Sequence, residues 1–120
     1  MKDHINLGKS GEEMAVKYLE GKGLKILDRN WRFGREEIDI IARDGNFVVI
    51  VEVKTRSSNA LIEPETAVGR DKQRILVRAA NAYMNFRRLP GEVRFDIITV
   101  LIRPDGESLR HIPDAFYATL

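Results

Sequence analysis

The segment EIDIIARDGNFVVIVEVKTR, residues 37–56, decides the fold of this chain. Two runs rich in isoleucine and valine, residues 37–43 and 47–56, flank Asp44-Gly45, a dipeptide typical of a tight β-turn. The segment therefore predicts a β-hairpin whose strands place Asp39, Glu52 and Lys54 among apolar neighbours.

The predicted hairpin brings the two acids to one face of the sheet. If Asp44 and Gly45 are the two turn residues, Asp39 falls opposite Ile50 and becomes a diagonal neighbour of Glu52. At about 7–8 Å between their backbones, both carboxylates can reach one cation. Lys54 points to the same face. The inference depends on the turn, because a one-residue change in its length would turn one strand over.

These charges need partners, because the stretch from Val48 to Lys54 reads as buried on both faces. One solution is a hard divalent cation bound by Asp39 and Glu52, with Lys54 neutralising a phosphate or orienting a nucleophile. The other is an ordinary salt bridge from Glu52 to Lys54 or an arginine, while Asp39 accepts backbone hydrogen bonds. The residues by themselves leave both solutions open.

The rest of the chain predicts two helices and further strands. Helical spacing indicates a helix over 10–20, with Ser10 and Glu13 as a capping box, and a strand over 24–31 follows. A longer helix over 69–88 precedes a strand over 93–102 and a short edge strand over 109–112. The apolar side of the longer helix is expected to consist of Ile75, Ala79, Ala82, Tyr83 and Phe86. The order predicts an α/β fold with a central mixed sheet flanked by helices.

Composition limits the kind of protein. The 120 residues predict a single domain over 1–120, and a hydrophobic fraction of 43% with a charged fraction of 32% is ordinary for a globular chain. There is no cysteine, which excludes disulfides and thiolate metal sites and fits a reducing cytoplasm. Because no apolar run is long enough to cross a membrane, we expect a cytoplasmic protein with no membrane partner.

Basic residues concentrate on the second predicted helix. Arg70, Arg74 and Arg78 recur every four residues and form a ridge that either binds phosphates or is simply a solvated face. Lys72 points instead towards the apolar side of the helix. It either reaches the acids or lays its aliphatic stem over apolar surface, and both interpretations stay open.

The aromatic and histidine residues suggest no further chemistry. Trp31, Phe33 and Phe47 could stack on unpaired bases, although core packing is the expected role. His4 and His111 belong to no metal-spaced or triad pattern and are expected to be ordinary surface residues.

Several motifs together resemble a known nuclease core. Residues 37–41 followed by residues 51–56 resemble the restriction-endonuclease-like PD-(D/E)xK superfamily. The chain is more closely similar to the uncharacterised bacterial YraN family, whose members are similar to archaeal Holliday-junction resolvases. The resemblance extends over nearly the whole chain and includes Gly11-Glu12, Asn30-Trp31-Arg32, residues 72–80 and residues 94–97. Two positions depart from the pattern: Ile38 replaces the motif's proline, and Glu36 stands where the family usually has glycine.

The resemblance implies a restriction-endonuclease-like domain with a divalent metal site. Asp39 and Glu52 would bind Mg²⁺ or Mn²⁺, Lys54 would be the catalytic lysine, and Glu12 would complete the site directly or through water. DNA, in a structured or branched form, would be the partner, and the two-fold symmetry of a junction favours a homodimer. The residues expected to contact the nucleic acid are Arg56, Arg70, Lys72, Arg74 and Arg78.

Three functions follow from these residues. The first is a metal-dependent endonuclease acting on branched DNA, and the second is a catalytically silent DNA-binding adaptor that keeps the nuclease fold. The third is a glycoside hydrolase that uses the paired acids, in which Lys54 would have no evident role.

Overall fold

The computed structural model describes residues 7–57 and 68–116. Two helices and five strands follow one another along these residues: α1 (Leu7–Gly21), β1 (Lys25–Phe33), β2 (Glu36–Asp44), β3 (Phe47–Ser57), α2 (Arg70–Arg87), β4 (Glu92–Arg103) and β5 (Gly106–Phe116). Neither helix is long and apolar enough to cross a lipid bilayer.

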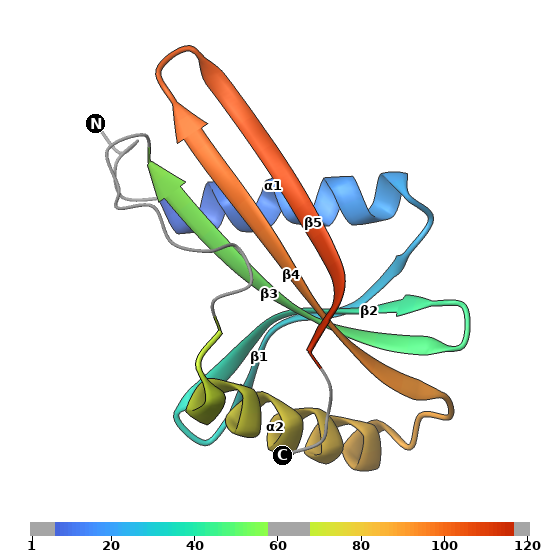
Figure 1. Ribbon diagram of the computed structural model, residues 1–120. Coiled ribbons are helices and arrows are strands. Elements are labelled where there is room, and N and C mark those ends of the chain that lie inside the picture. Colours follow the sequence, from blue (N-terminus) through green and yellow to red (C-terminus); the bar gives the residue numbers. More distant parts are fainter. Residues whose placement is uncertain (1–6, 58–67, 117–120) are drawn as a thin grey trace.

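The five strands form one mixed sheet in the order β1-β2-β3-β4-β5 (Figure 1). Neighbouring strands are antiparallel except β3 and β4, which run parallel and are connected through α2. A parallel pair needs such a crossover, because its strands start at the same edge of the sheet. The predicted α/β class is confirmed, and the architecture is consistent with a restriction-endonuclease-like fold.

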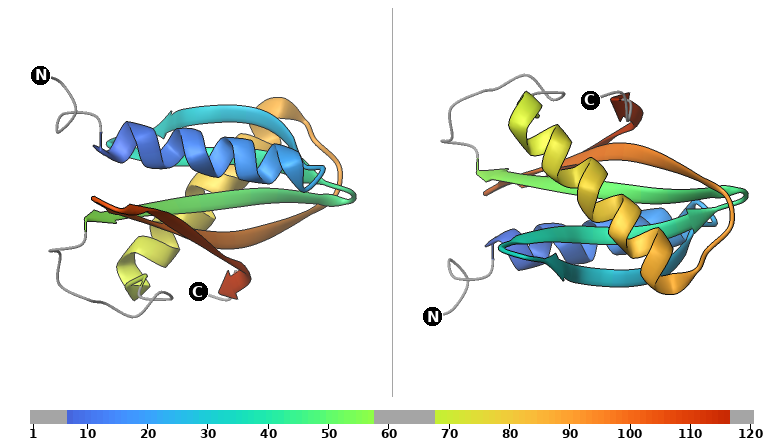
Figure 2. Two further views of the ribbon diagram at one scale, coloured as in Figure 1. Left: turned by 90° about the horizontal axis from the view of Figure 1, so that it is seen from above. Right: turned by 90° about the horizontal axis from the view of Figure 1, so that it is seen from below.

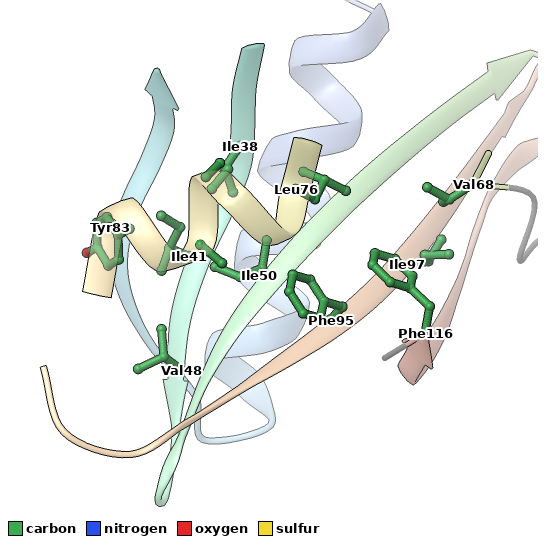
Figure 3. Close-up of a cluster of buried hydrophobic side chains, with 12 residues drawn as sticks. Ile38, Ile41, Val48, Ile50, Val68, Leu76, Tyr83, Phe95, Ile97 and Phe116 are labelled. Carbon is green, nitrogen blue, oxygen red and sulfur yellow. The ribbon is translucent and has the colours of Figure 1, made fainter. Parts of the chain in front are cut away.

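The helices cover opposite faces of the sheet (Figure 2). On the α1 face, Ala15 and Leu19 pack against side chains of the central strands, among them Ile40 and Val49. On the α2 face, Leu76, Ala79, Ala80 and Tyr83 pack against Ile38, Ile41, Val48, Ile50, Phe95 and Ile97 (Figure 3). Both faces of β2, β3 and β4 are therefore buried, which explains their unbroken apolar runs.

The register of the central hairpin differs from the prediction by two residues. The turn residues are Gly45 and Asn46, and Asp44 pairs with Phe47. Gly45 has a φ of 59° at the first turn position, where a type II′ turn favours glycine. Ile41, and not Asp39, therefore lies opposite Ile50. Because the error is an even number of residues, the predicted sharing of faces is unchanged.

Helix α1 begins at Leu7, earlier than predicted, so Ser10 lies inside the helix and the predicted capping box is wrong. Glu13 instead forms a salt bridge with Arg29 of β1 at 3.0 Å. Gly11 is buried against β3, where a methyl group in its place would overlap the Thr55 hydroxyl. The start of α1 is thus held close to the outer half of β3.

The edge strand β5 is longer than the predicted 109–112. It continues past Pro113, with an irregularity in the register opposite Phe95 and Ile97. An edge position tolerates proline, because the missing N–H would face no partner strand.

The buried side of α2 also differs from the prediction. Leu76 and Ala80 are buried, whereas Ile75 and Ala82 are partly exposed and Phe86 is 71% exposed. Helical spacing alone did not fix the rotation of α2 about its axis. Trp31 and Phe33 pack against the α2-face core, as expected, and Phe47 is 37% exposed at the start of β3.

Candidate functional site

The two acids of the central hairpin lie where β2 and β3 separate. The last backbone pair joins Ile40 to Val51; beyond it β2 stays with β1 while β3 continues beside β4, so the sheet opens into a fork (Figure 1). Asp39 and Glu52 are the next residues on the two strands, and the continued register sets them opposite each other. Extended past the fork, the observed register matches Asp39 directly with Glu52, where the sequence predicted a diagonal pair.

The Asp39 carboxylate occupies the opening between the strands. Its Oδ2 accepts a hydrogen bond of 2.8 Å from the backbone N–H of Val53. A side-chain oxygen thus bonds an amide that a continued ladder would have paired with a backbone carbonyl, and the Val53 donor stays satisfied. This bond orients the carboxylate, and no side chain in the described parts of the protein donates a hydrogen bond to Oδ1.

The environment of Asp39 disfavours its negative charge. Burial raises the pKa of Asp39 to about 7, from an ordinary value of 3.8. The hydrogen bond from Val53 opposes this rise, and the negative charges of Glu52 and Glu12 add to it. A carboxyl group whose pKa is raised by burial and by neighbouring acids is typical of sites that bind a cation or exchange a proton.

Two lysines stand beside the acids. Lys54 follows Glu52 on the same face of β3 and is 9% exposed. Lys72, in the first turn of α2, places its Nζ 3.4 Å from Glu36 Oε1. Burial raises the pKa of Glu52, and the positive charges of Lys72 and Lys54 reduce this rise. Lys72 therefore contacts Glu36, and its positive charge also lowers the pKa of Asp39.

Glu12 comes to the fork from the start of α1. Its Oε1 accepts a hydrogen bond of 3.1 Å from the Asn30 side-chain amide, which also donates to Glu37 Oε1 at 3.3 Å. Asn30 lies in β1 and has a left-handed φ of 52°. The charge of Glu12 contributes to the raised pKa of Asp39, so the two carboxylates are near each other. Glu13, by contrast, points to Arg29 and away from this group.

Three residues of this group were not identified from the sequence: Asn30, Glu36 and Glu37. The two glutamates directly precede the Ile-Asp motif, and their position was a usable signal. The sequence signal for Asn30 was weaker: asparagine is among the residues that adopt a left-handed φ most readily. In the structure, its neighbours in β1 pair with the β2 residues on either side of Asp39, so Asn30 lies across from Asp39.

The donor atoms of the acid pair are carboxylate oxygens, which suit a hard divalent cation. Within the described residues, no three histidine, cysteine, aspartate or glutamate side chains form a ready-made metal cluster. Mg²⁺ is commonly bound by one or two carboxylates, with water and substrate phosphate oxygens completing its shell. Asp39 and Glu52 offer this smaller set, with Glu12 close to Asp39.

The basic residues predicted to contact nucleic acid lie on α2 and near the end of β3. Arg70, Arg74 and Arg78 are exposed, and Arg74 pairs with the exposed Asp71 at 3.3 Å. Arg56 is partly buried and donates from Nη1 to the Thr55 carbonyl at 3.1 Å. The exposed ridge therefore starts at the same end of α2 as Lys72.

A second polar network lies on the opposite face of the sheet, and it corrects the expectation for His111. His111 is only 10% exposed, with Nε2 at 2.7 Å from Asp96 Oδ2 and Nδ1 at 3.1 Å from the Tyr18 hydroxyl. Arg94 donates from Nε and Nη2 to both oxygens of Asp96 at 2.9 Å, and the backbone N–H of Asp114 donates at 3.0 Å. His4 lies outside the described residues.

Sequence comparison with known proteins supplies the family. Residues 11–100 match the model of the uncharacterised protein family UPF0102. A UPF0102 protein of Bacteroides thetaiotaomicron is 49% identical over 120 residues, covering all of this chain and 99% of the relative. A UPF0102 protein of Flavobacterium johnsoniae is 42% identical over 121 residues, covering 98% of each chain. The resemblance to the YraN family is thereby confirmed, and the chain belongs to the uncharacterised family UPF0102.

Proposed function

We propose that this protein is a divalent-metal-dependent endonuclease that cuts structured or branched DNA. The observation that carries the proposal is the pair of opposed acids, Asp39 and Glu52, at the fork of β2 and β3, with pKa values raised by burial. The positive charges of Lys72 and Lys54 reduce the rise in the pKa of Glu52 but do not cancel it. Burying two acids in this way costs stability, and binding a cation would recover that cost.

In this proposal Asp39 and Glu52 hold Mg²⁺ or Mn²⁺, which when bound polarises a phosphodiester and lowers the pKa of a bound water. The Val53 amide orients the Asp39 carboxylate. Lys54 presents its ammonium group to the phosphate that is cut. Asn30 holds Glu12 near Asp39, where Glu12 would orient the attacking water.

Two further side chains complete the proposal for catalysis and binding. Lys72 stands on the α2 side of the acids and can balance charge on the substrate. The exposed ridge of Arg70, Arg74 and Arg78, together with Arg56, provides contacts to backbone phosphates. We place this activity in the cytoplasm, where a chain without cysteine is at no disadvantage. A homodimer would match the two-fold symmetry of a junction.

The test is a cleavage assay on four-way junctions, flaps, single strands and plain duplex, with Mg²⁺, Mn²⁺ or EDTA. The wild-type chain should cut branched DNA in the presence of metal. The Glu52→Gln variant should lose cleavage by at least about 100-fold, because a ligand of the catalytic cation is removed, while DNA binding persists. Glu20→Gln, an exposed acid of α1, is the matched control and should cut normally.

Two results would contradict this proposal in different ways. Cleavage that persists in Glu52→Gln would mean that the acid pair is not the active site or that a contaminating nuclease is present. Salt-sensitive DNA binding with no metal-dependent cleavage would instead identify a DNA-binding adaptor with a nuclease fold.

A further inference from the structure

The aromatic ring of Phe86 is largely exposed to solvent. It lies in the last turn of α2 and is 71% exposed, although a phenylalanine is usually buried. One side of the ring is supported by Trp31 of β1, with the ring centroids 6.3 Å apart and the planes inclined by 38°. Trp31 is itself fixed by an edge-to-face contact with the buried Tyr83, at 5.1 Å. Phe86 is therefore largely exposed, and Trp31 fixes the position of its ring.

The position of Phe86 on α2 connects it to the basic ridge. Arg70, Arg74 and Arg78 occur at intervals of four residues, and two further steps of four lead through Ala82 to Phe86. Residues four apart are neighbours on a helix surface, so the five side chains form one row, which turns about 160° around the helix axis between Arg70 and Phe86. At 1.5 Å per residue the row is about 24 Å long. It begins in the turn that carries Lys72 and ends at the aromatic ring.

The charges along the row indicate an anionic partner. Arg74 shares its charge with Asp71, a side chain that is 95% exposed. In the part of the chain that the structure describes, neither Arg70 nor Arg78 forms an ion pair. A polyanion lying on this row would thus meet three exposed guanidinium groups and then a flat apolar surface.

Single-stranded nucleic acid has both of the required chemistries. Its backbone carries one phosphate per nucleotide, and its unpaired bases present flat faces that stack on aromatic side chains with little dependence on sequence. In a duplex the base faces are covered by their neighbours, so a ring on the outside of a helix can reach no base except at an end or a branch. Exposed aromatic rings combined with basic side chains are the usual composition of single-strand-binding surfaces.

We propose that Phe86, supported by Trp31, is the stacking platform for an unpaired base of a strand whose phosphates lie along Arg70, Arg74 and Arg78. This inference rests on the proposed function for the identification of the polyanion as DNA, and it adds the substrate class. The preferred DNA has unpaired nucleotides that reach Phe86, about 24 Å along α2 from Arg70, as in a flap, a gap or an opened junction. Plain duplex gains nothing from the platform.

The chain provides its own reporter, because Trp31 is its single tryptophan. Intact protein is titrated in EDTA, so that no cutting occurs, with a short oligothymidylate and with a blunt duplex of equal length. Tryptophan fluorescence and fluorescence anisotropy of the labelled DNA are both recorded. The oligothymidylate should change the Trp31 emission, because a base stacked on Phe86 lies beside the indole, and the duplex should not.

Three variants separate stacking from other effects. Phe86→Ala should weaken oligothymidylate binding about tenfold or more and leave duplex binding within about twofold, because a stacked base contributes this much. Phe86→Tyr keeps an aromatic face and should bind like the wild type. Phe47→Ala removes a partly exposed ring on a different part of the sheet and should have no effect on oligothymidylate binding. Phe86 is too exposed for its loss to unfold the chain.

Several outcomes would overturn the platform. Equal affinities of Phe86→Ala and wild type for oligothymidylate would do so, as would equal losses on single strand and duplex. A change from dimer to monomer in Phe86→Ala, seen by analytical ultracentrifugation without any loss of DNA binding, would show that the ring is a contact between protein chains. These binding results are independent of cleavage, so failure of the nuclease assay with the binding pattern intact would refute the enzyme and leave the platform standing.

Discussion

Asp39 and Asp96 are carboxylates of the same sheet, the first partly buried and the second fully buried, and their surroundings are opposite. Asp96, on the α1 face, receives two hydrogen bonds from Arg94, one from the Asp114 amide and a contact with His111. Asp39, at the fork of β2 and β3, has one backbone amide, two acidic neighbours and, as a smaller effect, the positive charge of Lys72. Among the described residues, Asp96 is fully provided with hydrogen-bond donors and Asp39 is not.

The pKa values of the two groups move accordingly. Burial alone would raise the pKa of Asp96, but the bonds from His111 and Arg94 outweigh it, and the pKa is lowered. Burial raises the pKa of Asp39 to about 7, and one amide bond is too little to reverse this. Burial disfavours the negative charge of both groups, but their pKa values move in opposite directions, depending on whether the chain supplies hydrogen-bond donors. The comparison indicates that Asp96 stabilises the fold, and it supports the proposal that Asp39 binds a cation.

The largest expected effect is the loss of stability in Asp96→Asn. An amide cannot accept the paired bonds of Arg94, whose guanidinium would be left partly buried without its anion, so we expect a loss of about 3–5 kcal/mol. Urea denaturation at pH 7.5 measures it. The control is Asp44→Asn, which removes the more exposed partner of Arg94 and should cost less than about 1 kcal/mol. A loss in Asp96→Asn no larger than in the control would remove the distinction between the two carboxylates.

Asp39→Asn should have the opposite sign. The difference between a pKa of 3.8 and about 7 corresponds to at most about 4 kcal/mol, and because the amide is still a buried polar group we expect a gain of about 2 kcal/mol at pH 8. Wild-type Asp39 binds its proton more tightly when folded, so its contribution to stability is complete below pH 3.8 and is lost as the pH rises through about 7. The gain should therefore disappear towards pH 4.

Denaturation curves at several pH values, without metal, decide this prediction. A variant that is less stable than the wild type at pH 8 would mean that the Asp39 charge is already compensated. For Asp96, whose pKa is lowered, the wild-type stability is instead present above the ordinary pKa and lost as the pH falls. The stabilising effect of Asp39→Asn should consequently grow as the pH rises through neutrality. The destabilising effect of Asp96→Asn should instead shrink as the solution is made acidic.

The smallest expected effect concerns the outer end of the Asp96 network. Tyr18→Phe removes the hydroxyl that bonds His111 Nδ1 and should cost about 1 kcal/mol, the usual contribution of one hydrogen bond. Thermal and urea denaturation measure the loss. Mn²⁺ binding, followed by calorimetry, should be unchanged, because Tyr18 lies on the other face of the sheet from the acid pair. Weaker metal binding would show that the two networks are coupled through α1.

The sequence predicted those features that depend on local pattern. The alternation of apolar residues gave the strands, and the even spacing between Asp39, Ile41 and the β3 residues gave their common face. The register was wrong because Asp44-Gly45 and Gly45-Asn46 are both acceptable turns, and the choice between them depends on the whole sheet. The predicted rotation of α2 failed for a similar reason, since the side that contains Phe86 is apolar enough to have been buried.

Features that join distant parts of the chain could not be predicted. The partners of His111 come from α1 and β4, and no spacing in the sequence relates them. Asn30 was known only as part of a family resemblance. Its left-handed backbone and its bond to Glu12 depend on the packing of α1 across the fork. Whether the acid pair binds metal and whether the protein cuts DNA remain predictions.

The parallel pairing of β3 with β4 has a consequence for the order in which the molecule folds. The β2–β3 and β4–β5 pairs join neighbours in the chain, whereas β3 and β4 meet only after a long loop that includes α2 has closed. Contacts of this kind form late and limit the folding rate. Val51 pairs with Asp96 in this ladder, and Glu52 follows it directly. A chain still emerging from the ribosome can thus pair β2 with β3 and bring Asp39 towards Glu52, whereas the network around Asp96 can form only after β4 and β5 have been synthesised.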